Sequence, residues 1–431
     1  MRRCALFIPE NTNEREAMSA FAFIRDNLHF LAAGCLLMFA SSFGQTFFIS
    51  TFAAEIMGAF NLTDGQWGLT YTLGTSASAV AMFWAGALTD RFRVRGLAWI
   101  VLPGLAVSCF FMAFNTWVAG LVACVFLLRF FGQGMTYQLA AVAMARWFIA
   151  RRGLALSLSN MGIAFGTAVL PMICAALLAW ITWQAIWVAA GIALLVLFPL
   201  LLYLLSQERT PQSHADEAEA VGMEGRHWTR AEVLKSPLFW LLVPALLGPP
   251  AWGTSLFFQQ VHIAEVKGWP LVSYLSLIPM LMVVSVGVTL VSGLLIDRFG
   301  TGRLLQVYLI PWIVGFAILS FAQSLFWAGV AFLVFGFCMG MQATIITAFW
   351  AEYYGTRHIG AIKATSASIM VFGSAIGPGI TGALIDAGFD FPDQMIAISV
   401  YFALALGSVW IGISRAGQSL AAARQVNVEG A

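Results

Sequence analysis

Gly86-Ala87-Leu88-Thr89-Asp90-Arg91-Phe92 recurs further along the chain as Gly293-Leu294-Leu295-Ile296-Asp297-Arg298-Phe299. The offset is 297 − 90 = 207 residues, and it also relates Gly153 to Gly360, Phe165 to Phe372, Gly166 to Gly373 and Pro171 to Pro378. A further match, Phe47-Phe48…Ala54-Glu55 with Phe257-Phe258…Ala264-Glu265, has an offset of 265 − 55 = 210 residues. Matches in register at one spacing indicate two homologous halves.

The composition indicates that the chain lies in a membrane. Of 431 residues, 60% are hydrophobic and 10% are charged, whereas soluble domains carry about 25% charged residues. The net charge of +2 is spread over short separated loops, so no nucleic acid is expected as a partner. The six cysteines show no CxxC or metal-ligand spacing, so we expect no disulfide framework, no metal and no other cofactor.

Twelve stretches of the chain are long and apolar enough to cross a bilayer as helices, which takes roughly 20 residues each. The predicted fold is therefore an all-α membrane protein with twelve transmembrane helices in two pseudo-symmetric six-helix bundles. The predicted spans are 28–55, 66–89, 97–116, 118–144, 153–179, 184–206, 237–262, 271–295, 303–322, 325–351, 362–386 and 394–414.

The loops divide and orient the chain. Cytoplasmic loops carry an excess of Lys and Arg, and here nearly all cations share one face while the opposite face keeps Lys267 alone. Both termini are therefore predicted to be cytoplasmic, in a multi-pass protein of the bacterial inner membrane. The predicted segments are an N-terminal segment 1–27, a first bundle 28–206, a central loop 207–236, a second bundle 237–414 and a tail 415–431.

A parallel duplication of this kind is the architecture of one large class of secondary transporters, with the substrate site between the halves. The loop after the second span resembles the G-x-L-x-D-R-x-G-x-x-R motif of the major facilitator superfamily. Its residues are Gly86, Leu88, Asp90, Arg91 and Arg95, and the second copy has Gly293, Asp297, Arg298, Gly300 and Arg303. The resemblance implies that these loops act as latches for one transport state, although Arg93 occupies a position where Gly is usual.

Two further segments resemble the monocarboxylate and oxalate/formate branch of that superfamily. One is Trp147-Phe148-x-x-Arg151-Arg152-Gly153 followed by Gly162 and Gly166, and the other runs from Gly360 through Gly373 to Gly377-Pro378 and Gly382. The Gly377-Pro378 region either packs helices closely or supplies flexibility.

Arg129 is the one strongly basic residue deep within a predicted span, where a cation costs about 2.5–3.5 kcal/mol on insertion scales. One interpretation is that its guanidinium attracts an anionic substrate, because it matches a carboxylate bidentately. The other is that it is the structural or coupling arginine usual in the fourth helix of the superfamily. In the superfamily pattern a Gly stands four residues after this arginine, whereas this chain has Gln133 there.

Other candidates for substrate binding are uncharged polar or aromatic residues on the inner spans, each of which could instead make a helix-to-helix hydrogen bond. They are Gln45, Tyr71, Tyr137, Gln138, Asn160, Gln259 and Gln342, with Thr46 and Thr75 beside them. No Asp or Glu lies near the middle of a span, so coupling would be carried by the substrate itself, would occur by exchange with a counter-substrate, or would be absent.

Gly248-Pro249-Pro250 lies inside the seventh span, where two prolines free backbone carbonyls and bend the helix. Unwound backbone at membrane depth lines cavities, so this motif is either a moving gate or a static kink.

These observations favour a transporter of a small organic anion such as a monocarboxylate, working by alternating access, as a monomer with a small-molecule substrate in the lipid bilayer. The many aromatic residues also allow an exporter of apolar or drug-like compounds. A membrane sensor or enzyme is a third alternative. No HExxH, GxSxG or phosphate-loop context supports an enzyme.

Overall fold

The computed structural model describes residues 23–85, 88–148, 152–207, 222–355 and 357–429, and these residues are helical with short turns and contain no strand. The first half comprises α2 (Leu28–Ser41), α3 (Thr46–Ile49), α4 (Ala53–Phe60), α5 (Asp64–Ala85), α6 (Leu88–Arg91), α7 (Val94–Phe114), α8 (Val118–Leu128), α9 (Tyr137–Trp147), α10 (Arg152–Leu177) and α11 (Trp183–Leu204). The second half comprises α12 (Arg230–Lys235), α13 (Pro237–Phe258), α14 (Gln260–Val266), α15 (Leu271–Leu275), α16 (Ile278–Phe299), α17 (Thr301–Leu305), α18 (Ile310–Phe321), α19 (Leu325–Tyr354), α20 (Ile359–Asp386) and α21 (Phe391–Glu429).

The predicted fold class is confirmed, and each predicted span corresponds to one helix or to consecutive helices. Among the described residues, ten helices are long and apolar enough to cross a membrane, and the bent pair Leu28–Gly44 and Thr46–Phe60 counts as an eleventh. The helix α5, of 22 residues, corresponds to the remaining span. It is long enough at about 1.5 Å per residue, but its threonines and serines make it less apolar. The last helix, α21, continues beyond the predicted limit at 414 to Glu429.

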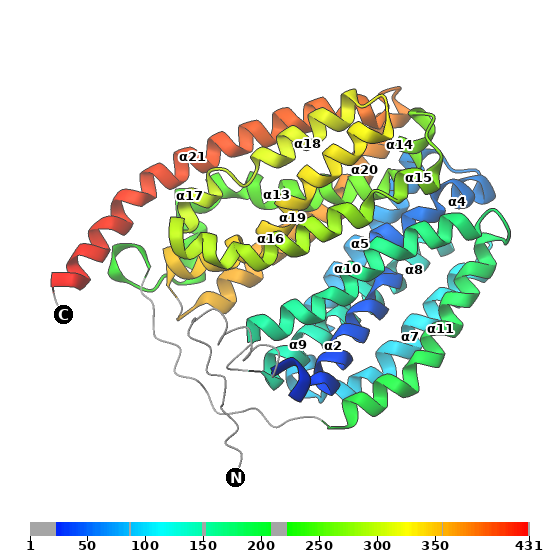
Figure 1. Cartoon of the computed structure of the whole chain (residues 1–431), viewed down its shortest axis with the longest axis horizontal. Coiled ribbons are helices and arrows are strands. Elements are labelled where there is room, and N and C mark those ends of the chain that lie inside the picture. Colours follow the sequence, from blue (N-terminus) through cyan, green and yellow to red (C-terminus); the bar gives the residue numbers. More distant parts are fainter. Residues whose placement is uncertain (1–22, 86–87, 149–151, 208–221, 356, 430–431) are drawn as a thin grey trace, which may run out of the picture.

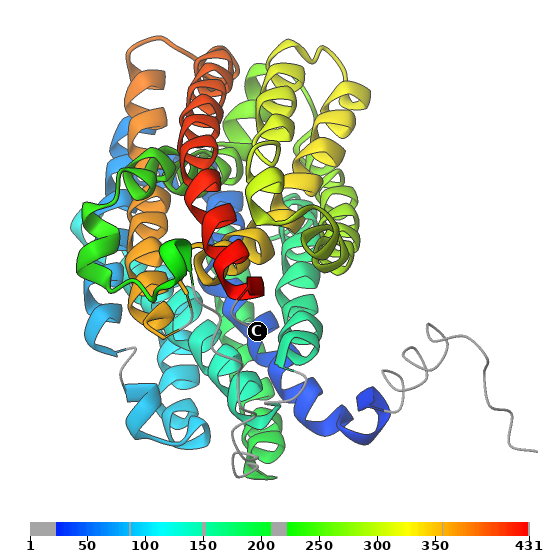
Figure 2. The ribbon, with the colours of Figure 1, turned by 90° about the vertical axis from the view of Figure 1, so that its left-hand side faces the viewer.

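The two halves lie side by side, and the start of α2 and the end of α21 lie at the same end of the molecule (Figure 1). We call this the terminal end. In the turned view, α5 of the first half runs beside α20 of the second, and α10 runs beside α16 (Figure 2). Large apolar side chains cover much of the outer surface, as with Val283 and Leu294 on α16, which are 73% and 71% exposed. Such a surface is stable only against lipid.

The halves contact each other mainly at the end away from the termini, which we call the closed end. Phe258 and Val261 of the second half belong to the apolar core of the first half, and Ala175 of α10 belongs to the core of the second. Where both partners are described, the hydrogen bonds that join the halves come from Ser50, Thr63, Thr72 and Gln260. At the terminal end the ribbons of the two halves diverge (Figure 1).

Candidate transport site

Arg129 lies where the fourth span changes from α8 to a π-helical segment, Arg129–Thr136. A π segment widens the helix by one residue per turn, and such segments occur often at functional sites. Gly132 and Gly134 lie within it. The Arg129 side chain is 1% exposed, so it is enclosed by protein.

The guanidinium of Arg129 faces the bend in the first span. The Nη1 atom lies 3.2 Å from Thr46 Oγ1 and 3.4 Å from the Gly44 carbonyl oxygen. Gln45, which lies between Gly44 and Thr46, is extended, with φ −87° and ψ 155°, and this interrupts the helix. The Gly44 carbonyl is therefore free to accept a hydrogen bond from Arg129. The Thr46 hydroxyl also bonds to the Tyr71 hydroxyl at 2.5 Å, and the Arg129 guanidinium lies 5.5 Å from the centre of the Tyr71 ring.

Among the described residues, no carboxylate balances the positive charge of Arg129. In the part of the chain that the structure describes, none of the ion pairs involves Arg129. Its Nε atom is buried without a hydrogen-bond partner. Neutral oxygens and an aromatic face compensate a buried cation only in part, so the guanidinium keeps an uncompensated positive charge.

Three aromatic rings pack beside this site, where α5 meets the second half. The Phe258 ring, from the second half, lies 4.8 Å from the Tyr71 ring and stacks on Trp67 at 5.7 Å. Tyr71 and Trp67 are one helical turn apart on α5, so both rings point to the same side. The Tyr71 ring therefore contacts both the Arg129 guanidinium and Phe258 of the second half.

The structure brings together only some of the predicted binding residues. Arg129, Gln45 and Tyr71 meet around Thr46, as described above. Gln259 instead donates to Thr381 Oγ1 at 3.1 Å within the second half. Tyr137 and Asn160 are exposed, Gln138 and Gln342 are half-buried, and none of the four is hydrogen-bonded to Arg129.

The helix that carries the predicted gate, Gly248-Pro249-Pro250, is not interrupted at these residues. The helix α13 runs without a break from Pro237 to Phe258, and the backbone departs from helical geometry at Gln259, with φ −89° and ψ 16°. The backbone is therefore not unwound at the prolines, and Gly248 packs against Tyr401 and Phe402. Whether the motif is a moving gate or a static kink stays a prediction.

At Gly377-Pro378 the geometry favours close packing. A methyl group added to Gly377 would lie 2.3 Å from the Ala251 carbonyl oxygen of α13, and α20 is continuous through Pro378. Of the latch residues, Gly86 and the side chains of Asp90, Arg91 and Asp297 lie outside the described residues. Gly293, Arg95, Arg298 and Arg303 are exposed near the terminal end, and their latch role stays a prediction.

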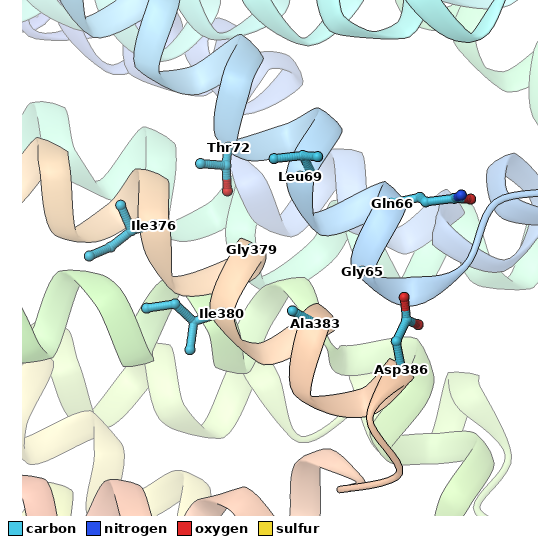
Figure 3. Close-up of a pocket in the computed structure, with 9 residues that line it drawn as sticks. All are labelled: Gly65, Gln66, Leu69, Thr72, Ile376, Gly379, Ile380, Ala383 and Asp386. Carbon is cyan, nitrogen blue, oxygen red and sulfur yellow. The ribbon is translucent and has the colours of Figure 1, made fainter.

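A shallow groove of about 520 Å³ follows the seam between α5 and α20 (Figure 3). Leu69 and Thr72 line it from α5, and Ile376, Ile380 and Asp386 line it from α20. Leu69 and Ile380 are exposed apolar residues, so this groove belongs to the outer surface of the seam and is separate from the enclosed Arg129 site.

Sequence reasoning missed Ser50 and Gln260, which bond the two halves directly. Both lie within the repeat that relates Phe47 to Phe257, at an offset of 260 − 50 = 210 residues. The repeat marks Ser50 and Gln260 as equivalent positions, but it does not show that they contact each other.

Helical halves of this arrangement define a membrane transporter of the parallel-repeat class. The family model of the Major Facilitator Superfamily matches residues 34–378 and 287–426, so the chain belongs to that superfamily. It is a multi-pass membrane protein, and members of this family move small molecules and are generally not enzymes.

The chain is similar to several transporters at low sequence identity. The uncharacterized MFS-type transporter YhjX of Escherichia coli is 22% identical over 73% of this chain and 78% of its own length. The uncharacterized transporter YybO of Bacillus subtilis is 23% identical over 84% of this chain and 88% of its own length. Among solved structures, a bacterial homologue of the human lysosomal transporter Spinster, inward-facing and unoccupied, has a TM-score of 0.64 at 17% identity, over 92% of this chain and 97% of its own. The nucleoside transporter NupG has a TM-score of 0.66 at 11% identity, over 89% of this chain and 99% of its own.

Proposed function

We propose that the chain is a secondary transporter of a small organic anion, such as a monocarboxylate, working by alternating access. The observation that carries this proposal is the enclosed Arg129 guanidinium, which has two neutral oxygen contacts and no carboxylate partner among the described residues. A substrate carboxylate would supply the missing negative charge and the acceptor for Nε. The Tyr71 and Thr46 hydroxyls would then orient it.

Uptake of radiolabelled L-lactate and oxalate into proteoliposomes tests the proposal. We expect Arg129→Gln to abolish saturable uptake and Arg129→Lys to retain a small part of it, because an ammonium keeps the charge but loses the bidentate geometry. Arg357→Gln, which removes one exposed cation near the terminal end, is the matched control and should leave uptake unchanged.

Two results would count against the proposal: carboxylate uptake that is absent in the wild type, or uptake that is unchanged in Arg129→Gln. Resistance to apolar compounds conferred on a pump-deficient host would then favour the drug-exporter alternative.

The same proposal orients the protein in the bacterial inner membrane with both termini in the cytoplasm, since the cations gather at the terminal end. The closed end then faces outward and the conformation is inward-facing. Labelling of intact cells with a membrane-impermeant maleimide, with the native cysteines replaced, should modify Val266→Cys but not Arg357→Cys. The reverse pattern would invert the orientation.

For coupling, we propose that the substrate carries its own proton or exchanges with a counter-substrate, in a monomeric protein. Uptake stimulated by an inward pH gradient would indicate a co-transported proton, and uptake stimulated by internal anion would indicate exchange.

A further inference from the structure

Ser50 and Gln260 form a reciprocal hydrogen-bonded contact across the closed end, which we call the clasp. Ser50 Oγ donates to the Phe257 carbonyl oxygen at 2.6 Å. Gln260 Nε2 lies 3.1 Å from the Phe47 carbonyl oxygen, 3.0 Å from Thr51 Oγ1 and 3.2 Å from Ser50 Oγ. Ser50 and Gln260 are 0% and 1% exposed, so water does not compete for these bonds.

The clasp follows the internal repeat. Phe47 and Phe257 are equivalent, as are Ser50 and Gln260, since both pairs differ by 210 residues (257 − 47 and 260 − 50). Each half therefore donates from one position to the main-chain carbonyl of the equivalent partner position in the other half. A contact of this kind forms and breaks as one unit, because both bonds depend on the same relative position of the two halves.

The clasp and the Arg129 site hold the same short segment of the first span. The helix α3 is a single turn, Thr46–Ile49, between the break at Gln45 and a 3₁₀ turn, Ser50–Phe52. Arg129 contacts Gly44 and Thr46 at its start. Gln260 contacts Phe47, Ser50 and Thr51 at its end. A displacement at one end is transmitted to the other because the turn is too short to absorb it.

Building on the proposed function, we propose that an anion bound at Arg129 releases the clasp and so opens the closed end. The anionic oxygen is a stronger acceptor than the Gly44 carbonyl or the Thr46 hydroxyl, so it replaces them on the guanidinium. The freed segment from Gly44 to Thr51 then shifts, and the bonds from Ser50 to Phe257 and from Gln260 to Phe47 are lost together. The empty transporter favours the form that is closed at this end, because Arg129 holds the segment in the geometry that the clasp requires.

Reciprocity gives a sharp test of this coupling. If the anion releases the clasp, removal of the clasp must strengthen anion binding by the same factor, and such couplings are typically about 5- to 150-fold. We expect Ser50→Ala and Gln260→Leu to raise the affinity for L-lactate or oxalate at least about fivefold in titration calorimetry of nanodisc-embedded protein. Ser50→Ala removes only a hydroxyl group, so it tests the idea even if Gln260→Leu does not fold.

Matched controls separate the clasp from a general loss of buried hydrogen bonds. Among the described residues, the Ser255 side chain, also 0% exposed, bonds to Ala251 of its own helix. The Gln394 side chain, 6% exposed, bonds there to Thr381 and Phe389 of its own half. Ser255→Ala and Gln394→Leu should leave anion affinity unchanged.

The state of the closed end is read by spin labels on Gly58→Cys and Val266→Cys, one on each half, in a background without the native cysteines. A Cβ at Gly58 meets no atom within 4 Å, and Val266 is 45% exposed. We expect the distance between the labels to lengthen when L-lactate is added, and to be long without anion in Ser50→Ala.

Clasp variants that open the closed end but bind the anion with unchanged affinity would overturn the coupling. Absence of anion binding in every form, with opening still caused by Ser50→Ala, would instead refute the proposed substrate while leaving the clasp as the closing contact.

Discussion

Gly44 in the first span and Gly132 in the fourth pack backbone against backbone. A methyl group added to Gly132 would lie 2.6 Å from the Gly44 Cα, and one added to Gly44 would lie 2.1 Å from the Leu128 carbonyl oxygen. This approach brings the Gly44 carbonyl within reach of Arg129, at 3.4 Å, which is near the limit of a hydrogen bond. The candidate anion site therefore exists only because neither position carries a side chain.

Gly132→Ala should separate the two spans and remove the bond from Arg129 to Gly44. We expect a cost of about 1–3 kcal/mol, typical of overpacking, with loss of anion uptake. Thermal unfolding and proteoliposome uptake measure the two effects. Gly134→Ala is the matched control in the same π segment, because the nearest obstacle to its methyl group is the flexible Met82 side chain. Equal damage from both substitutions would contradict the backbone contact.

Gly68→Ala should weaken the seam between α5 and α20. The added methyl group would lie 2.5 Å from the Pro378 carbonyl oxygen, which is main chain and cannot turn away. We expect a lower unfolding temperature and a closed end that opens more readily, measured with the spin-label pair described above. Gly407→Ala on α21 meets no atom within 4 Å and should be neutral or stabilising by up to about 1 kcal/mol through helix propensity. An unchanged unfolding temperature and an unchanged label distance in Gly68→Ala would contradict the close contact between α5 and α20.

Replacement of Pro249 or Pro250 by alanine should leave most of the uptake intact. The reason is that α13 is already helical at these residues and its break lies at Gln259. Initial uptake rates of the two single variants, each above about half of the wild-type rate, would agree with a static kink. An inactive variant with an unchanged unfolding temperature would instead favour the hypothesis that the prolines form a moving gate.

The stability of the N-terminus of α12 should depend on pH. Glu232 accepts bonds from the backbone and hydroxyl of Thr229 and from Arg226, and these contacts lower its pKa to about 2. A carboxyl group with a lowered pKa stabilises the folded segment above its ordinary pKa and loses that effect as the pH falls toward 2. Hydrogen exchange at Thr229 and Glu232 should therefore be slow near neutral pH and accelerate below about pH 4.5.

The matched substitution is Glu232→Gln, which should show fast exchange at neutral pH and little further change on acidification. Exchange at these amides that does not depend on pH in the wild type, after correction for the intrinsic rate, would exclude this capping role.

The sequence by itself determined the twelve spans, the two homologous halves and the superfamily. Each rests on a local property: apolar length, loop charge, and motifs such as Asp90-Arg91 that repeat at 207 residues (297 − 90). Arg129 was also identified from the sequence, because one cation inside an apolar run is conspicuous at any position.

Only the tertiary structure decided what surrounds Arg129 and how the halves meet. The break at Gln45, the uninterrupted α13 at Pro249, and the contact of Gly44 with Gly132 depend on neighbours that are remote in the chain. The clasp joins Ser50 to Phe257, 207 residues away, and neither hydroxyl nor carbonyl differs in sequence from many others. Hydrogen bonds between segments depend on geometry within a few tenths of an ångström, which periodicity and composition do not encode.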